Sequence, residues 1–149
     1  MKFRISVSKE KYDQIKDYLT KMGIETGDDA EYVISENHYS GNFIPARNDK
    51  KERINISSDD VIYIESFGDD IEIHTGEGLF YARDRMYKLE ESLDKTSFIR
   101  ISKSVIISRK HIKKIRPTLS MKYILTMTDG SLVDVTRSHY ASFRSFMNI

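Results

Sequence analysis

The sequence has no cysteine and no tryptophan among its 149 residues. Without cysteine the chain cannot form a disulfide, use a thiolate as a nucleophile or hold a metal through sulfur. No apolar run approaches the ~18 residues that a membrane-spanning helix needs, and the first residues do not resemble a signal peptide. We therefore expect a cytoplasmic protein that does not insert into a membrane.

Sequence motifs for catalysis are also missing. The chain has no Gly-x-Ser-x-Gly elbow, no glycine-rich phosphate loop and no dinucleotide fingerprint, and its four histidines lack metal-ligand spacing. Its paired carboxylates fall in expected turns or on one helix face, where acidic side chains are usually solvated. Because a catalytic dyad needs two carboxylates that converge in a pocket, we predict a protein that is not an enzyme and uses no metal or cofactor.

The charged residues are distributed unevenly along the chain. The net charge is +1, but residues 97–149 carry ten basic and only two acidic side chains. This segment therefore has a charge of +8, and residues 1–96 have a charge of −7. Such asymmetry is typical of a protein with a polyanionic partner. The alternative is a solvated charged face with no partner, which the charge alone does not exclude.

The first 40 residues predict a small β-α-β unit. Residues 2–7 alternate as in a strand, Ser8 suits a helix N-cap, and Gly23 is placed to end the helix. Residues 32–34 are a short strand candidate. A unit of this size is too small to be stable alone, so we expect it to pack on the rest of the protein or on a second copy. Residues 41–51 predict a linker, because a glycine and a proline precede a charged run.

Short strands dominate the chain from residue 52 onward. A first group is expected at residues 53–57, 61–66, 70–75 and 79–83, and a second at residues 98–101, 105–107, 111–116, 122–128 and 131–136. We predict turns at Gly68-Asp69 and at residues 76–78, and a type I′ hairpin turn at Asp129-Gly130. Two short helices are expected, one capped by Asp84 and one by Ser138. The predicted fold is mainly β, and α+β for the chain as a whole.

The most informative stretch mixes β-forming apolar residues with basic and hydroxyl residues. At its start, in residues 98–107, apolar and polar residues nearly alternate, as in a half-buried strand whose polar side faces an anion. This stretch is one of six that occur in a recognisable order and spacing: residues 61–66 (VIYIES), 89–93 (LEESL), 98–107 (FIRISKSVII), 112–115 (IKKI), 129–130 (DG) and 135–140 (VTRSHY). Over residues 52–149 the chain thus resembles the LytTR (LytR/AlgR-type) DNA-binding domain of bacterial transcription regulators.

The resemblance implies a fold and a way of binding DNA. Family members have an elongated domain of short antiparallel sheets with short helices, and they insert loops into successive major grooves. They typically bind direct repeats of double-stranded DNA as a pair of protomers. By this resemblance we expect a homodimeric, sequence-specific transcription regulator.

The resemblance also assigns residues to the DNA. The base-contacting positions fall at Lys103 and Arg137 and, in a further loop, near Asp69, whose carboxylate can accept from cytosine N4 but is more often repelled near phosphates. The expected phosphate contacts are Arg100, Ser102, Ser104, Arg109, Lys110, Thr136 and Ser138. The alternatives without DNA are a surface ion pair between Arg137 and Asp134, and a solvated strand residue at Lys103. The family often has His at position 102 and Asn at position 108, where this chain has serine.

The segment before the resemblance bears on regulation. Many relatives carry a receiver domain of about 120 residues at this place, whereas only about 50 residues precede it here. We therefore expect no phosphorelay input. A second function remains open, in which the chain is an interaction module that pairs with another regulator protein and does not itself read bases.

Overall fold

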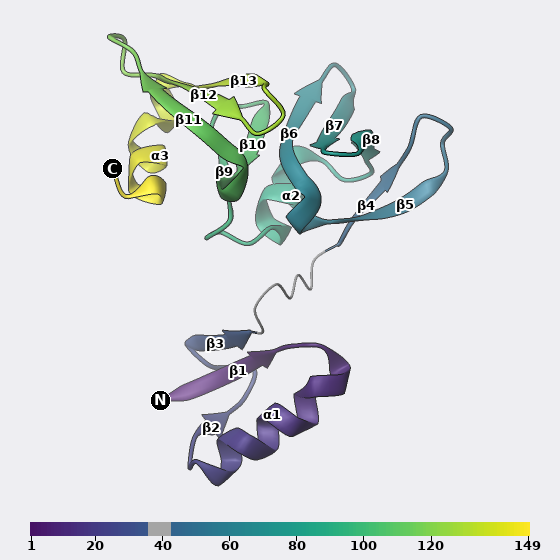
Figure 1. Ribbon diagram of the computed structural model, residues 1–149, viewed down its shortest axis with the longest axis vertical. Coiled ribbons are helices and arrows are strands. Elements are labelled where there is room, and N and C mark those ends of the chain that lie inside the picture. Colours follow the sequence, from purple (N-terminus) through teal and green to yellow (C-terminus); the bar gives the residue numbers. More distant parts are fainter. Residues whose placement is uncertain (36–42) are drawn as a thin grey trace. The chain divides into compact units, whose positions relative to one another are not determined.

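The structure, a computed structural model, describes residues 1–35 and 43–149 (Figure 1). The chain divides into two compact units, Met1–Gly41 and Asn42–Ile149, here called unit 1 and unit 2. The boundary expected after residue 40 lies outside the described residues. In the part of the chain that is described, no helix is long and apolar enough to cross a membrane.

Unit 1 contains the predicted β-α-β arrangement. Its elements are β1 (Lys2–Ser6), α1 (Lys9–Lys21), β2 (Glu25–Thr26) and β3 (Tyr32–Ser35), with parallel strands in the order β2-β1-β3. Gly23 has a φ of 77° and its N–H donates to the Thr20 carbonyl, while the Ile24 N–H donates to the Leu19 carbonyl. This Schellman motif ends α1 at the glycine, as the sequence predicts.

Unit 2 is built on a seven-stranded sheet with the order β5-β4-β8-β7-β6-β10-β9. All its strand pairs are antiparallel, as expected for this fold class. The strands and the helix that packs on them are β4 (Phe43–Arg47), β5 (Arg53–Ser57), β6 (Val61–Phe67), β7 (Asp70–Thr75), β8 (Gly78–Ala82), α2 (Met86–Ser92), β9 (Phe98–Arg100) and β10 (Val105–Ser108). Short 3-10 turns follow β5 at Ser58–Asp60 and β10 at Arg109–His111.

The expected linker at residues 41–51 is wrong for its middle part, which forms strand β4. Pro45 suggested a linker, but it lies where β4 pairs on one side with β5, and pairing with β8 starts only at Ala46. The backbone N–H that proline lacks is therefore not needed for strand pairing at this position. Ile44 and Ala46 alternate with exposed neighbours and are both buried. This alternation is the signal that the proline obscured.

A second, three-stranded antiparallel sheet ends unit 2. It consists of β11 (Ile112–Pro117), β12 (Tyr123–Met127) and β13 (Leu132–Val135) in that order. A 3-10 turn (Arg137–His139) and α3 (Tyr140–Met147) follow, and α3 lies beside this sheet in Figure 1. The hairpin between β12 and β13 is confirmed, but its turn is not type I′. Gly130 alone has a positive φ, 87°, and its N–H donates to the Met127 carbonyl, as in a three-residue hairpin loop.

The helix caps differ from the prediction. Arg85, and not Asp84, occupies the N-cap position of α2, and His139, and not Ser138, occupies that of α3. Both helices therefore begin one residue later than predicted: Arg85 still has an extended backbone, and Ser138 belongs to the preceding 3-10 turn.

Two apolar cores share the central strands β6 and β10. Ile64 and Ile106 face one core, whereas Tyr63, Val105 and Ile107 face the other. Because side chains alternate along a strand, both faces of these strands are buried, which explains their nearly continuous apolar sequence. The α2-side core comprises Ile44, Ala46, Ile56, Val61, Ile64, Ile71, Ile73, Met86, Leu89, Leu93, Phe98 and Ile106. The α3-side core comprises Ile62, Tyr63, Ile101, Val105, Ile107, Tyr123, Leu125, Met127, Val133, Val135 and Phe143.

Candidate nucleic-acid interface

The turn between β9 and β10 presents Lys103 to solvent. Its base is closed by a hydrogen bond from the Ile101 N–H to the Val105 carbonyl, at 3.0 Å. Within the turn the Ser104 N–H donates to the Ser102 hydroxyl oxygen at 3.2 Å. Ile101 is fully buried and Ser102 nearly so, while Lys103 is exposed. The turn is therefore an ordered support for one outward-pointing cation.

Arg100 holds this turn from behind. Its guanidinium donates to the Glu90 carboxylate at 2.9 Å, to the Ser102 carbonyl at 3.1 Å and to the Lys103 carbonyl. Glu90 lies on α2 and was expected to face solvent, so the sequence did not predict this contact. Because these three contacts occupy much of the guanidinium, Arg100 fixes the turn and is poorly placed to contact a phosphate.

The end of β13 is joined to the same turn. Both the N–H and the hydroxyl of Thr136 donate to the Ile101 carbonyl, at 3.0 and 3.2 Å. The Thr136 hydroxyl also lies 2.9 Å from Nδ1 of His139, which is 3.1 Å from the Ser138 hydroxyl. These contacts bring the loop that carries Arg137 next to the loop that carries Lys103, although the two residues are 34 positions apart.

Arg137 is exposed, and within the described residues no side chain pairs with its guanidinium. The ion pair with Asp134, which was the alternative without DNA, does not form in this part of the chain. Lys103 likewise has no side-chain partner among the described residues. Two cations on neighbouring loops are therefore available to a ligand.

The turn between β6 and β7 reaches the same end of the sheet. The Ser66 N–H donates to the Ser104 carbonyl at 2.7 Å, which aligns this turn with the Lys103 turn. Gly68 has a φ of 61° and Asp69 is exposed beside it. Three loops therefore gather at one end of unit 2: residues 67–70, residues 101–104 and residues 136–139. We call this group the loop cluster.

Arg109 and Lys110 lie elsewhere. They follow β10 at its far end from Lys103, and the strand alone separates the two ends by roughly 10 Å. The Lys110 amine is 3.2 Å from the Asp59 carboxylate, and the Arg109 guanidinium stacks over the Phe146 ring at 5.0 Å. The structure therefore divides the expected phosphate contacts between two ends of the sheet.

The hydroxyls of the loop cluster are partly occupied. Ser102 accepts from the Ser104 backbone, and Thr136 donates to the Ile101 carbonyl, so both help to shape their loops. Ser138 is exposed next to Arg137. His139, one of the four histidines without metal-ligand spacing, contacts the Thr136 and Ser138 hydroxyls through Nδ1. Its only sequence signal is its place next to two hydroxyl residues in the VTRSHY stretch.

Tyr63 lies in the α3-side core and pairs with Ile107 of β10. Its hydroxyl is 3.4 Å from the Ser131 hydroxyl, and its ring stacks on His74 with centroids 4.1 Å apart. Burial raises the pKa of Tyr63 above its ordinary value. The ring therefore acts as a neutral group that ties β6 to the β12–β13 hairpin.

Known proteins match the same region of the chain. The family model of the LytTr DNA-binding domain matches residues 51–148. The transcriptional regulatory protein LytR of Staphylococcus aureus (strain N315) is 28% identical over 125 residues, which cover 82% of this chain and 50% of the relative. The sensory transduction protein LytT of Bacillus subtilis (strain 168) is 26% identical over 94 residues, which cover 63% of this chain and 39% of the relative. The chain thus spans half or less of the length of these relatives.

A solved structure agrees with the sequence comparisons. The LytTr DNA-binding domain of a putative methyl-accepting/DNA response regulator from Bacillus cereus superposes with a TM-score of 0.68 and 26% identity. The match covers 73% of this chain and the whole of that domain. The family is a DNA-binding domain without enzymatic activity, which agrees with the expectation from the sequence. With two thirds of its residues matched, the chain belongs to the LytTr DNA-binding domain family.

Proposed function

We propose that this protein is a DNA-binding transcription regulator that reads a specific sequence through the loop cluster. Family membership and the regulator relatives support DNA binding. The observation that carries the proposal is the junction of the Thr136 and Ile101 loops, because it presents Lys103 and Arg137 together and unpaired among the described residues. The basic charge of residues 97–149 favours the same partner.

The two cations have different roles in this proposal. The Arg137 guanidinium can donate two hydrogen bonds to guanine O6 and N7, and the Lys103 amine can donate to the same acceptors as a point charge. A major groove is about 12 Å wide, so it can admit a narrow turn. In this proposal Ser104 and Ser138 contact the flanking phosphates, and Arg100 keeps the Lys103 turn in shape.

Unit 1 is assigned to contacts between two copies of the chain on direct repeats. Only Val7 and Leu19 are buried among its described residues, and both apolar cores lie in unit 2. Domains under about 40 residues usually need a disulfide, a metal or oligomerisation. The chain has no cysteine, and its described residues contain no group of His, Asp or Glu that could hold a metal. Burial against the rest of the protein or against a second copy remains, and the proposed homodimer takes the second copy.

A second candidate function is pairing with another regulator protein without reading bases. Asp69 favours it, because a carboxylate at the tip of one loop is repelled by DNA phosphates. The loop cluster would then present Lys103 and Arg137 to an acidic protein surface.

Selection from random duplexes with the full-length chain, at a stated salt concentration, separates these two functions. We expect an enriched motif in which guanine is required, and two copies of it in the same orientation. Recovery of duplexes without any shared motif would contradict sequence reading and favour the second function. Because non-specific binding is strongly salt-dependent, the selection is repeated at a higher salt concentration, where the motif should persist.

A further inference from the structure

The loop cluster contains an aromatic ring that neither DNA charge nor core packing explains. Phe67 is the last residue of β6 and is 70% exposed, whereas the preceding apolar residues of this strand are buried. A single exposed apolar residue is common on protein surfaces. This one directly precedes the exposed Gly68-Asp69 turn, which belongs to the loop cluster.

Strand register places Phe67 on the side of the sheet that carries the other two loops. Glu65 pairs with Val105, whose side chain belongs to the α3-side core. Paired residues in an antiparallel sheet point to the same face, and residues two apart on a strand also share a face. Phe67 is therefore on the α3 side of the sheet. The core on that side includes Val135 of β13, which precedes Arg137 by two residues.

Phe67 is also close to the Lys103 turn. Its neighbour Ser66 donates its N–H to the Ser104 carbonyl at 2.7 Å, and adjacent Cα atoms are about 3.8 Å apart. Lys103 in turn directly precedes Ser104. A groove that holds the Lys103 side chain is therefore within reach of the Phe67 ring.

The other side chains of this turn cannot donate a hydrogen bond to a base. Gly68 has no side chain, and the Asp69 carboxylate accepts hydrogen bonds when ionised. An apolar ring has one distinctive target in the major groove, which is the C5-methyl group of thymine. The turn is thus suited to apolar recognition, in contrast to the donor-based recognition by Lys103 and Arg137.

We propose that Phe67 reads the C5-methyl group of a thymine in the groove entered by Lys103. This inference rests on the proposed DNA-reading function and adds a specificity-determining residue to it. Burial of one methyl group corresponds to an affinity change of about fourfold. Truncation of the whole ring should weaken binding by at least that factor.

The test combines one protein change with one change in the DNA. The selected duplex is prepared with deoxyuridine in place of thymidine at one position at a time, which removes only the methyl group. The full-length wild-type chain should lose about fourfold in affinity at one or two of these positions. Phe67→Ala should bind the thymidine duplex at least about fourfold more weakly and should lose no further affinity on the deoxyuridine duplex.

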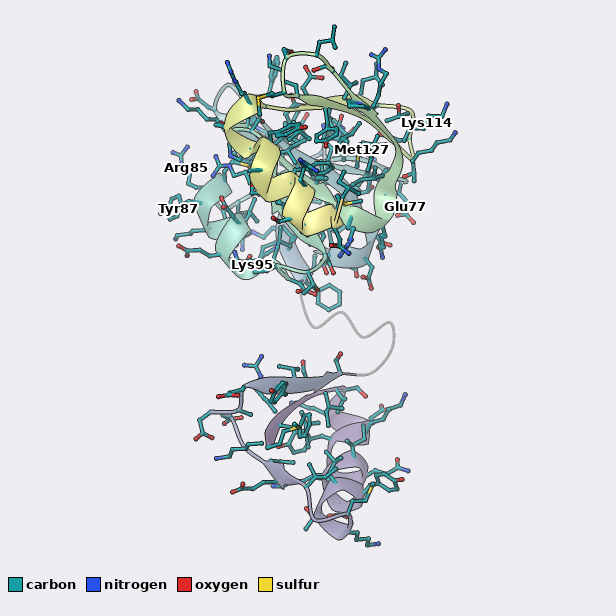
Figure 2. All side chains as sticks on the ribbon, turned by 90° about the vertical axis from the view of Figure 1, so that its left-hand side faces the viewer. Glu77, Arg85, Tyr87, Lys95, Lys114 and Met127 are labelled. Atoms are coloured by element: carbon teal, nitrogen blue, oxygen red, sulfur yellow. The ribbon has the colours of Figure 1, made fainter. Side chains whose placement is uncertain are left out.

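A matched control is available on the opposite side of the sheet. Tyr87 is also a largely exposed aromatic residue, at 57%, and lies on α2, where its side chain points away from the ribbon (Figure 2). Tyr87→Ala should bind both duplexes as the wild type does. Because Phe67 is exposed, the melting temperature of Phe67→Ala should equal that of the wild type.

Three results would overturn the inference. They are a selected motif without thymine, a wild-type chain indifferent to every deoxyuridine, and a Phe67→Ala variant that keeps the full deoxyuridine penalty. Each of these leaves the proposed function intact as long as a motif is selected. If no motif is selected, the proposed function fails first and the assignment of Phe67 fails with it.

Discussion

The two ends of strand β10 both carry exposed cations, but the cations differ in their surroundings. At the loop-cluster end, Lys103 and Arg137 have no side-chain partner among the described residues. At the other end, Lys110 pairs with Asp59 and Arg109 stacks on Phe146. A count of basic residues treats all four alike, whereas their contacts indicate which end is prepared for an anionic partner.

The largest expected effect comes from the loop-cluster end. Arg137→Ala should weaken binding to the selected duplex by about 1–3 kcal/mol and relax the preference at one base position, because one side chain supplies two hydrogen bonds to one base. Gel-shift titration against the duplex and its single-base variants measures both. Arg53→Ala, an exposed arginine on β5, serves as control. Unchanged affinity and preference in Arg137→Ala would remove the difference between the two ends.

Arg100 tests whether the shape of the Lys103 turn matters as well as its charge. Arg100→Ala should weaken specific binding by at least about tenfold, because it removes two hydrogen bonds to the turn and one to Glu90, and a hydrogen bond to a charged group contributes about 1.5–3 kcal/mol. Glu90→Gln keeps an acceptor at the same place and should have a smaller effect. Titration at several salt concentrations distinguishes this role, since a positioning residue leaves the salt slope unchanged. A slope lowered by about one would mean that Arg100 contacts a phosphate after all.

The opposite end should respond weakly. Lys110→Ala is expected to change affinity by less than about twofold and to leave the salt slope unchanged, because Lys110 lies away from the loop cluster. The exposed pair with Asp59 is worth only about 0–1 kcal/mol, so protein stability should also change little. Asp59→Ala is the matched variant. If Lys110→Ala lowers the slope by about one, the DNA contacts both ends of the strand.

Tyr63 lies between the two ends and should affect stability rather than DNA binding. Its pKa is raised in the folded protein mainly by burial, so its contribution to stability is complete below the ordinary tyrosine pKa and falls as the pH rises above it. Tyr63→Phe should bind DNA as the wild type does, should destabilise by about 0.5 kcal/mol near neutral pH, and should lose less stability above pH ~10. Urea unfolding across this range measures it. If Tyr63→Phe lost as much stability as the wild type above pH ~10, Tyr63 would be solvated in the folded protein.

Local patterns in the sequence predicted most strands and the β12–β13 hairpin, because alternation and turn glycines are local signals. They did not predict β4, where Pro45 hid the alternation of Ile44 and Ala46. The residues of the loop cluster came from the family resemblance, whereas their grouping depends on contacts that span 35 residues, such as that of Thr136 with Ile101. Nor did any local pattern connect Glu90 with Arg100 or separate Lys110 from Lys103, since the first depends on how α2 packs beside β9 and the second on the direction of β10.

The burial of β6 and β10 on both faces has a consequence for the dynamics of the loop cluster. Backbone amides in strands that two cores cover exchange with solvent only when most of the unit opens. The turns at residues 67–70 and 101–104 begin at the ends of these strands, so their anchor points fluctuate little in the free protein. Loops held in this way lose little conformational entropy on meeting a ligand, and slow hydrogen exchange at Ile64 and Ile106 would be the signature of such preorganisation.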